Sequence, residues 1–130
     1  MKKPNPTSGL RHVALSVHEL EATEHFYVEL MGMSVEWRPD QDNVYLTSGN
    51  DNLALHRASG DLNPAANQVL DHIGFILKQA DDVDDWYRFL VAAGIEMRTQ
   101  PKTHRDGARS FYCYDPAGNT VQIIYHPPIA

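Results

Sequence analysis

Two histidines occupy the same place in two similar stretches of the chain. Residues 10–17 read LRHVALSV and residues 70–77 read LDHIGFIL, so His12 and His72 both stand third in a short apolar run. Neutral imidazole binds ions of the Zn, Ni, Mn and Fe type. A lone histidine in an apolar run is usually a hydrogen-bonded pocket residue. Two at matched positions favour contact with a metal ion or a substrate.

The similarity between the two stretches continues along the chain at an offset of 60 residues, which indicates a duplicated module. Two such modules are expected to pack with pseudo-twofold symmetry and to bring the first-strand histidines near one another. At this offset Glu36 and Glu96 become symmetry mates, for which a paired structural role is the simpler interpretation. The other matched residues are Phe26-Tyr27 with Trp86-Tyr87, Leu30 with Leu90, Val35 with Ile95, and Arg38 with Arg98.

The secondary-structure pattern of each copy reads βαβββ, which predicts an α+β fold. We expect modules over 9–57 and 69–126, joined by a linker over 58–68, in a single domain with a mobile leader over 1–9. The two sheets are expected to curve into a partly open barrel with the helices outside. The expected strands are 10–17, 34–38, 44–47, 52–57, 70–77, 95–98, 110–114 and 120–125, with helices to about 31 and 93 and a loop over 100–109.

Composition limits the classes of function. The chain has 130 residues, a net charge of −6 and 42% hydrophobic residues, which suits one globular domain. The negative charge argues against binding to nucleic acid or to an anionic membrane. Cys113 is the only cysteine, so no intramolecular disulfide can form. The sequence shows no signal peptide and no membrane-spanning run, and we therefore expect a cytoplasmic protein.

The duplicated modules, the two first-strand histidines and the stretch 115–122 (DPAGNTVQ) resemble the vicinal oxygen chelate superfamily over about residues 9–126. That superfamily includes glyoxalase I, extradiol dioxygenases, fosfomycin-resistance proteins, bleomycin-binding proteins and methylmalonyl-CoA epimerases. Its metal-dependent members take ligands from the first and last strand of each module. The resemblance therefore implies a divalent ion (Zn, Ni, Mn or Fe) on His12, His72 and Gln122, the last where the family usually has Glu.

The fourth ligand position of the family falls on Ala54, which cannot bind a metal ion. His56 lies two residues further on and faces the same side of its strand, so it would ligate only if the geometry is shifted. For His56 a half-exposed strand histidine is the alternative. For Gln122 ligation and a purely structural role are equally supported, because an amide oxygen brings no charge to the ion.

Several candidates follow for binding a small-molecule substrate. The loop 102–109 joins two strands of the second module, and loops of this kind often close over ligands. Arg105 and Arg109 would hold an anionic group by paired N–H donors, with His104 beside them and Tyr112 orienting the substrate. The alternatives are a solvated loop and a tyrosine that packs in the core.

Two classes of function remain open from the sequence. The first is a metal-dependent enzyme that stabilises an enolate-like or oxyanion intermediate, as lyase, isomerase, dioxygenase or epoxide-opening enzyme, with no catalytic acid or base assigned. Gln122 argues against a standard glyoxalase I site and a standard iron dioxygenase triad. The second is a metal-free binding protein of the bleomycin-resistance type, and a relative without activity is a further alternative. The resemblance also implies a homodimer, with the site sometimes completed across subunits.

Overall fold

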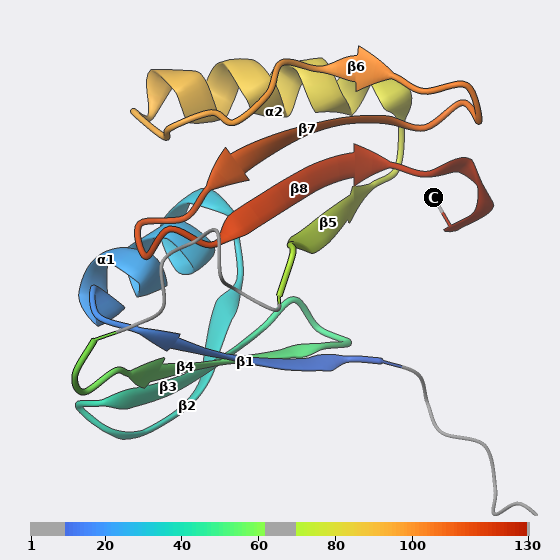
Figure 1. The fold of residues 1–130 in the computed structure, drawn as a ribbon. Coiled ribbons are helices and arrows are strands. Elements are labelled where there is room, and N and C mark those ends of the chain that lie inside the picture. The colour runs from blue at the N-terminus through green and yellow to red at the C-terminus, as the bar shows by residue number, and fades with distance from the viewer. Residues whose placement is uncertain (1–9, 62–69, 130) are drawn as a thin grey trace, which may run out of the picture. The chain divides into compact units, whose positions relative to one another are not determined.

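The chain forms two units, each with a four-stranded sheet and one helical segment (Figure 1). The computed structural model describes residues 10–61 and 70–129, and the two units meet in sequence between Gly60 and Asp61. The expected leader over 1–9 and residues 62–68 of the expected linker lie outside the described residues.

Unit 1 has its strands in the order β1-β4-β3-β2, with β1 and β4 parallel and the other pairs antiparallel. Its elements are β1 (His12–Val17), α1 (Leu20–His25) continuing into the π-helical turn η1 (Phe26–Leu30), β2 (Ser34–Asp40), β3 (Asn43–Thr47) and β4 (Asn52–Arg57). Because β1 and β4 run in the same direction, the helix and two strands between them form the crossover that a parallel pair needs.

Unit 2 repeats this arrangement, with strand order β5-β8-β7-β6 and with β5 and β8 parallel. Its elements are β5 (Ile73–Leu77), α2 (Ala80–Ala92), β6 (Lys102–Thr103), β7 (Arg109–Tyr114), β8 (Thr120–Tyr125) and a final 3-10 turn, η3 (Pro127–Ile129). The predicted α+β class and the duplicated βαβββ modules are therefore confirmed, and neither sheet closes on itself.

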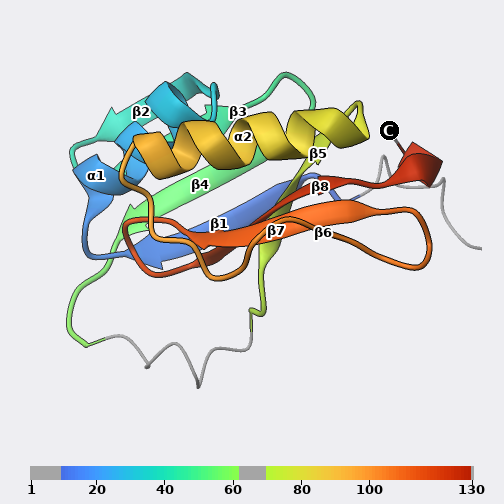
Figure 2. The same cartoon turned by 90° about the horizontal axis from the view of Figure 1, so that it is seen from above.

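Each sheet has an apolar face, where the helix packs. In unit 1 the buried residues alternate along β1 and β3, while β4 is buried at Leu53, Ala54 and Leu55 in succession, and Phe26 and Tyr27 of η1 are fully buried with them. In unit 2, α2 covers β7 and β8 (Figures 1 and 2) and contributes Val83 and Leu90 to the core. Cys113 lies in the same core, and burial raises the pKa of its thiol to about 12. The cysteine is therefore a small core residue that stays protonated.

The expected strand over 95–98 forms only in part. Met97 makes an isolated bridge with Cys113, and the backbone N–H groups of Arg98 and Thr99 both donate to the carbonyl of Tyr112, at 2.9 and 3.1 Å. Two residues opposite one constitute a β-bulge, which ends the regular pairing. Pairing resumes at β6, inside the stretch 100–109 that was expected to be a loop.

The expected offset of 60 residues holds only up to the helices. Gly32 and Gly94 end the two helical segments with φ of 83° and 82°, a conformation that glycine adopts without strain. These glycines are 62 positions apart, so the second helical segment is two residues longer than the first. The sequence could have revealed this difference in length, because each glycine stands just before the next expected strand.

The pairing of Glu36 with Glu96 as symmetry mates is therefore wrong. Val35 and Met97 each face the equivalent position of the third strand of their module, so they correspond to one another. One residue further, Glu36 corresponds to Arg98. The two modules thus carry opposite charges at this position.

Replacing Phe111 with alanine tests the core of unit 2. Phe111 is fully buried and meets the ring of Tyr87 edge-on at 5.3 Å, so Phe111→Ala should lower the free energy of unfolding by about 3–5 kcal/mol. Phe89→Ala is the matched control, because this ring of α2 is 48% exposed and should cost less than about 1 kcal/mol. Urea denaturation measures both, and equal losses would contradict the assigned core.

Candidate functional site

The face of the unit 1 sheet opposite its buried core carries polar and aromatic side chains. We call it the polar face. Its members follow from the strand registers, in which His12 pairs with Asn52, Ala14 with Ala54, Ser16 with His56, and Tyr45 with Ala54. The polar face consists of His12, Ala14 and Ser16 on β1, Asn52, Ala54 and His56 on β4, and Asn43 and Tyr45 on β3.

His12 is held by a chain of two hydrogen bonds. Its Nδ1 lies 2.7 Å from Oδ1 of Asn52, and Nδ2 of Asn52 donates to a carboxylate oxygen of Glu36 at 3.0 Å. A carboxylate can only accept here, so the amide must turn its NH₂ to Glu36 and its oxygen to the histidine. His12 therefore donates from Nδ1, and the lone pair of a neutral ring lies on Nε2. Metal-bound histidines are oriented in this way.

His56 has the same kind of support. Its Nδ1 lies 2.6 Å from Oδ1 of Asn43, whose Nδ2 donates to both carboxylate oxygens of Asp40, at 2.9 and 3.1 Å. The backbone N–H of Asp42 and the amide of Asn43 hold the pKa of Asp40 below its ordinary value. Asp40 is therefore an ionised acceptor near neutral pH, and His56 also keeps its proton on Nδ1.

The register separates these two histidines. His12 pairs with Asn52 at one end of β4, and His56 pairs with Ser16 four residues further along. Four residues of strand span about 13 Å. Two nitrogen ligands of one ion lie only about 4 Å apart, since each is about 2 Å from the metal. To share one ion, both imidazoles would have to lean toward each other along the sheet, whereas each Nδ1 is held by the asparagine at its own level, which favours separate roles for His12 and His56.

In unit 2, His72 directly precedes β5. Its Nδ1 lies 2.6 Å from a carboxylate oxygen of Asp71, which leaves Nε2 without a proton in the neutral ring. The imidazole meets the ring of Tyr112 edge-on at 5.2 Å, and the guanidinium of Arg98 lies 5.8 Å from the centre of the same ring. Tyr112 is half-buried, and its ring contacts both the imidazole of His72 and the guanidinium of Arg98.

Gln122 lies on β8 beside Gly74 and Tyr112. Its Nε2 donates to Oγ of Ser110 at 3.1 Å, and Nε2 of His104 lies 3.3 Å from the same oxygen. Since the serine accepts from the amide, its own proton is available to His104. These contacts direct the NH₂ of Gln122 toward Ser110, and the carbonyl oxygen remains available as a ligand atom.

Arg109 contacts the helix of its own unit. Its guanidinium donates to both carboxylate oxygens of Asp84, at 2.9 and 2.7 Å, and to Oγ1 of Thr103 at 2.9 Å. The hydrogen bonds from Arg109 lower the pKa of Asp84, and Asp84 raises the pKa of the guanidinium. Arg109 thus connects β7 to α2, whereas Arg105 is exposed between β6 and β7. A role for either in substrate binding stays a prediction.

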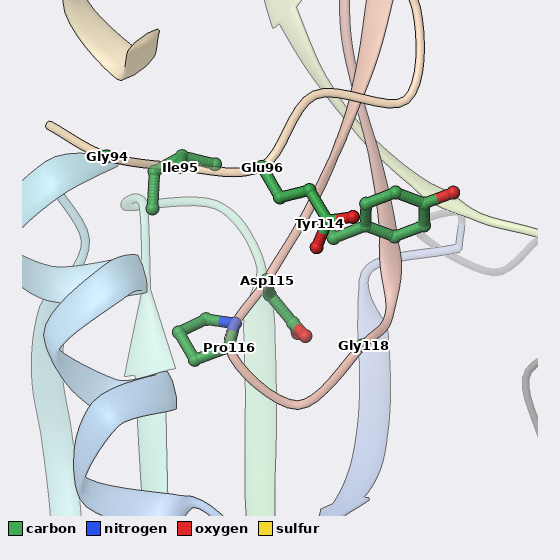
Figure 3. A pocket seen from close by; sticks show the side chains of 7 residues that line it. All are labelled: Gly94, Ile95, Glu96, Tyr114, Asp115, Pro116 and Gly118. Carbon is green, nitrogen blue, oxygen red and sulfur yellow. The ribbon is translucent and has the colours of Figure 1, made fainter. Parts of the chain in front are cut away.

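A pocket of about 540 Å³ lies at another place in unit 2 (Figure 3). The chain over 94–96 forms one side and the turn around Asp115 forms the other. The carboxylate of Asp115 accepts the backbone N–H groups of Ala117 and Asn119, so it stabilises the turn. None of the predicted site residues lines this pocket.

Within residues 10–61 and 70–129, no three or more His, Cys, Asp and Glu side chains group so as to hold a metal ion. The predicted set of His12, His72 and Gln122 contains only two side chains of these types, because its third member is an amide. Among the helices of the described residues, none is long and apolar enough to cross a membrane.

Sequence analysis did not find the residues that orient the candidate ligands. These residues are Asn52, Asn43 and Ser110, together with Glu36 and Asp40, whose carboxylates accept hydrogen bonds from the two asparagines. Asn52 lies 40 positions from His12, and no local pattern connects the two. The signal that could have helped is the parallel pairing of first and last strands, which places the start of one beside the start of the other.

Two βαβββ modules with a histidine at the start of each define a protein of the glyoxalase-like class. A sequence model of the Glyoxalase/Bleomycin resistance protein/Dioxygenase superfamily matches residues 9–123, and the chain belongs to this superfamily.

Three solved structures illustrate the similarity. A lactoylglutathione lyase from Agrobacterium tumefaciens has 25% sequence identity and a TM-score of 0.75, covering 93% of this chain and 96% of that one. A possible glyoxalase from Bacillus cereus has 21% identity and a TM-score of 0.74, covering 91% and 99%. An integron cassette protein from the mobile metagenome of the Halifax Harbour sewage outfall has 21% identity and a TM-score of 0.76, covering 92% and 100%. The last two show the fold alone.

The contact between Arg109 and Asp84 predicts a pH-dependent contribution to stability. Because the pKa of Asp84 is lowered in the folded state, its ion pair stabilises the protein above the ordinary value of 3.8 and is lost as pH falls through the lower folded value. Asp84→Asn should therefore destabilise the protein by up to about 1 kcal/mol at neutral pH.

The measurement is urea denaturation of both proteins from pH 7 downward. The difference between them should stay constant to about pH 5 and shrink at lower pH. Asp85→Asn, at a neighbouring and more exposed position, is the control. An unchanged stability at pH 7 would leave Arg109 free for another role.

Proposed function

We propose that the protein is a divalent-metal-dependent enzyme acting on a small molecule, with His12, His72 and Gln122 as the residues that hold the ion. One observation supports this most strongly. Both histidines have Nδ1 engaged by an oxygen, at 2.7 and 2.6 Å, and therefore present Nε2 as the lone-pair atom. His56 has the same arrangement, so what distinguishes His12 and His72 is that they also occupy matched positions of the repeat.

The proposed donor set is neutral. It consists of two imidazoles and one amide oxygen, and Ala54 stands where a fourth ligand would be. Such a set suits Zn, Ni, Mn or Fe(II) ions, but it binds them less tightly than a set with carboxylates. When bound, the ion would supply a Lewis acid for adjacent oxygen atoms of a substrate and so favour a negatively charged intermediate.

The chain's own residues would bind and orient that substrate. Tyr112 lies next to His72 and Arg98 lies against the ring of Tyr112, and a phenol and a guanidinium suit an oxygen-rich ligand. Arg105 and His104 lie in the hairpin between β6 and β7, and they suit an anionic group at the edge of the sheet. The resemblance to a lactoylglutathione lyase at 25% identity supports a lyase or isomerase among the reactions considered.

The alternative function is a metal-free binding protein of the bleomycin-resistance type. It is supported by the donor set, because Ala54 and Gln122 stand where metal-dependent relatives have ligands, usually Glu at the second of these positions. In that case His12 and His72 would be hydrogen-bonding residues of a ligand cavity. A cytoplasmic location stays a prediction under either function.

Metal content decides between the two functions. Protein purified without chelator or affinity nickel should contain near one ion per chain by elemental analysis, and His12→Ala should lose it. Asn52→Leu should weaken zinc affinity by about 10–100-fold, because the partner that orients the ligand is gone. Gln122→Glu should tighten binding, since a carboxylate adds the missing charge.

His25→Ala is the matched control, because His25 is exposed at the end of α1 and belongs to no proposed site. Its metal content should equal that of the original protein. If no variant or original protein takes up Zn, Mn, Fe or Ni after incubation, the metal-dependent enzyme is rejected and the binding protein takes its place.

We also propose a homodimer, as the family resemblance implies. Light scattering at working concentration should give about twice the mass of a 14.7 kDa chain. A monomer would contradict the dimer and would require any proposed site to be completed within one chain.

A further inference from the structure

The polar face of unit 1 contains a second oriented imidazole that the proposed metal site does not use. His56 is half-buried on β4, and its Nδ1 is engaged by Asn43 at 2.6 Å. The register sets it about 13 Å along the sheet from the level of His12. We propose that His56 is a proton acceptor for a ligand lying on this face, and not a ligand of the same metal ion as His12.

The first step of the argument is the state of the ring. The amide nitrogen of Asn43 donates to both carboxylate oxygens of Asp40, so the amide oxygen is the atom that faces His56. The neutral imidazole must then carry its proton on Nδ1. Nε2 is left with a lone pair, which is the requirement for accepting a proton from a ligand.

The second step concerns the charge that proton transfer creates. When a ligand C–H or O–H gives its proton to Nε2, the electron pair stays on the ligand and the ring becomes a cation. The Nδ1 proton remains in its hydrogen bond to Asn43. The amide cannot pass a proton on, so Asp40 stays an anion behind it and stabilises the imidazolium electrostatically. His56, Asn43 and Asp40 thus resemble a base with an orienting amide and a supporting acid.

The third step is the surface between the two histidines. Ala14 and Ala54 lie side by side at the level between His12 and His56, and neither side chain extends beyond Cβ; Ala14 is exposed, whereas Ala54 is buried. Tyr45 borders this floor, stacked on Trp37 at 5.2 Å and meeting the ring of His56 edge-on at 6.1 Å. The exposed part of this face, at Ala14 and at Ser16 beside His56, thus has an aromatic ring at its border and a base at its end, which suits a planar or partly apolar molecule.

The inference rests on the proposed function only in assuming that a ligand occupies the polar face. It is tested with the metal-free protein, so the two ideas fail separately. The probe is 5-nitrobenzisoxazole, from which a base removes the ring C–H proton. That electron pair forms the nitrile, the N–O bond breaks, and its electrons go to the phenolate oxygen, whose colour is measured.

We expect the original protein to accelerate this elimination and His56→Gln to slow it by about tenfold or more. Asn43→Leu should also slow it, because the ring is no longer held in the productive tautomer. The rate of Asp40→Asn should lie between those of the original protein and of Asn43→Leu. His25→Gln is the control and should leave the rate unchanged. A rate no greater than that of the same concentration of free imidazole, or no loss in His56→Gln, would overturn the proposal.

Two further readouts separate chemistry from folding and from metal binding. Nitrogen-15 NMR of the imidazoles should show the Nδ1–H tautomer for His56 in the original protein and a mixture in Asn43→Leu. The opposite tautomer in the original protein would also overturn the proposal. Zinc affinity should be unchanged in His56→Gln, whereas a loss would mean that His56 ligates the ion after all. Thermal unfolding confirms that each variant is folded.

Discussion

The parallel pairing of the first and last strand in each module is the constraint on which the structure depends. β1 pairs with β4, and β5 pairs with β8, in the same sense. A parallel pair needs a crossover, and the helix with the two middle strands provides it. This pairing brings His12 beside Asn52, which orients it, and Gln122 beside Gly74, whereas the contacts that orient His72 and Gln122 come from Asp71 and Ser110.

The two modules share this architecture but differ in the chemistry of their polar side chains. On the polar face of unit 1 an asparagine amide stands between each of His12 and His56 and a carboxylate, so the amide orients the imidazole and accepts no proton from it. In unit 2 the carboxylate of Asp71 touches His72 directly, and Arg98 takes the place that Glu36 has in unit 1. The two modules thus share one strand topology, and different residues at a few positions give each module its own polar groups.

The sequence predicted the elements whose signals are local. Alternating apolar residues located most of the strands, and Gly32 and Gly94 marked the ends of the helical segments. The strand predicted over 95–98 forms only in part, since the bulge at Arg98 and Thr99 depends on a carbonyl of Tyr112 further along the chain. Counting a constant offset through helices of different length also paired Glu36 with the wrong residue.

By itself the sequence determined the superfamily and the βαβββ repeat, and it proposed His12, His72 and Gln122 as candidate ligands, because these follow from patterns within a few residues and from their repetition. Only the tertiary structure decided which nitrogen of each histidine is engaged and that Arg109 binds Asp84. The physical reason is that hydrogen-bond partners are chosen by strand register and helix packing. These bring together residues such as His12 and Asn52, which are 40 positions apart and share no local signal.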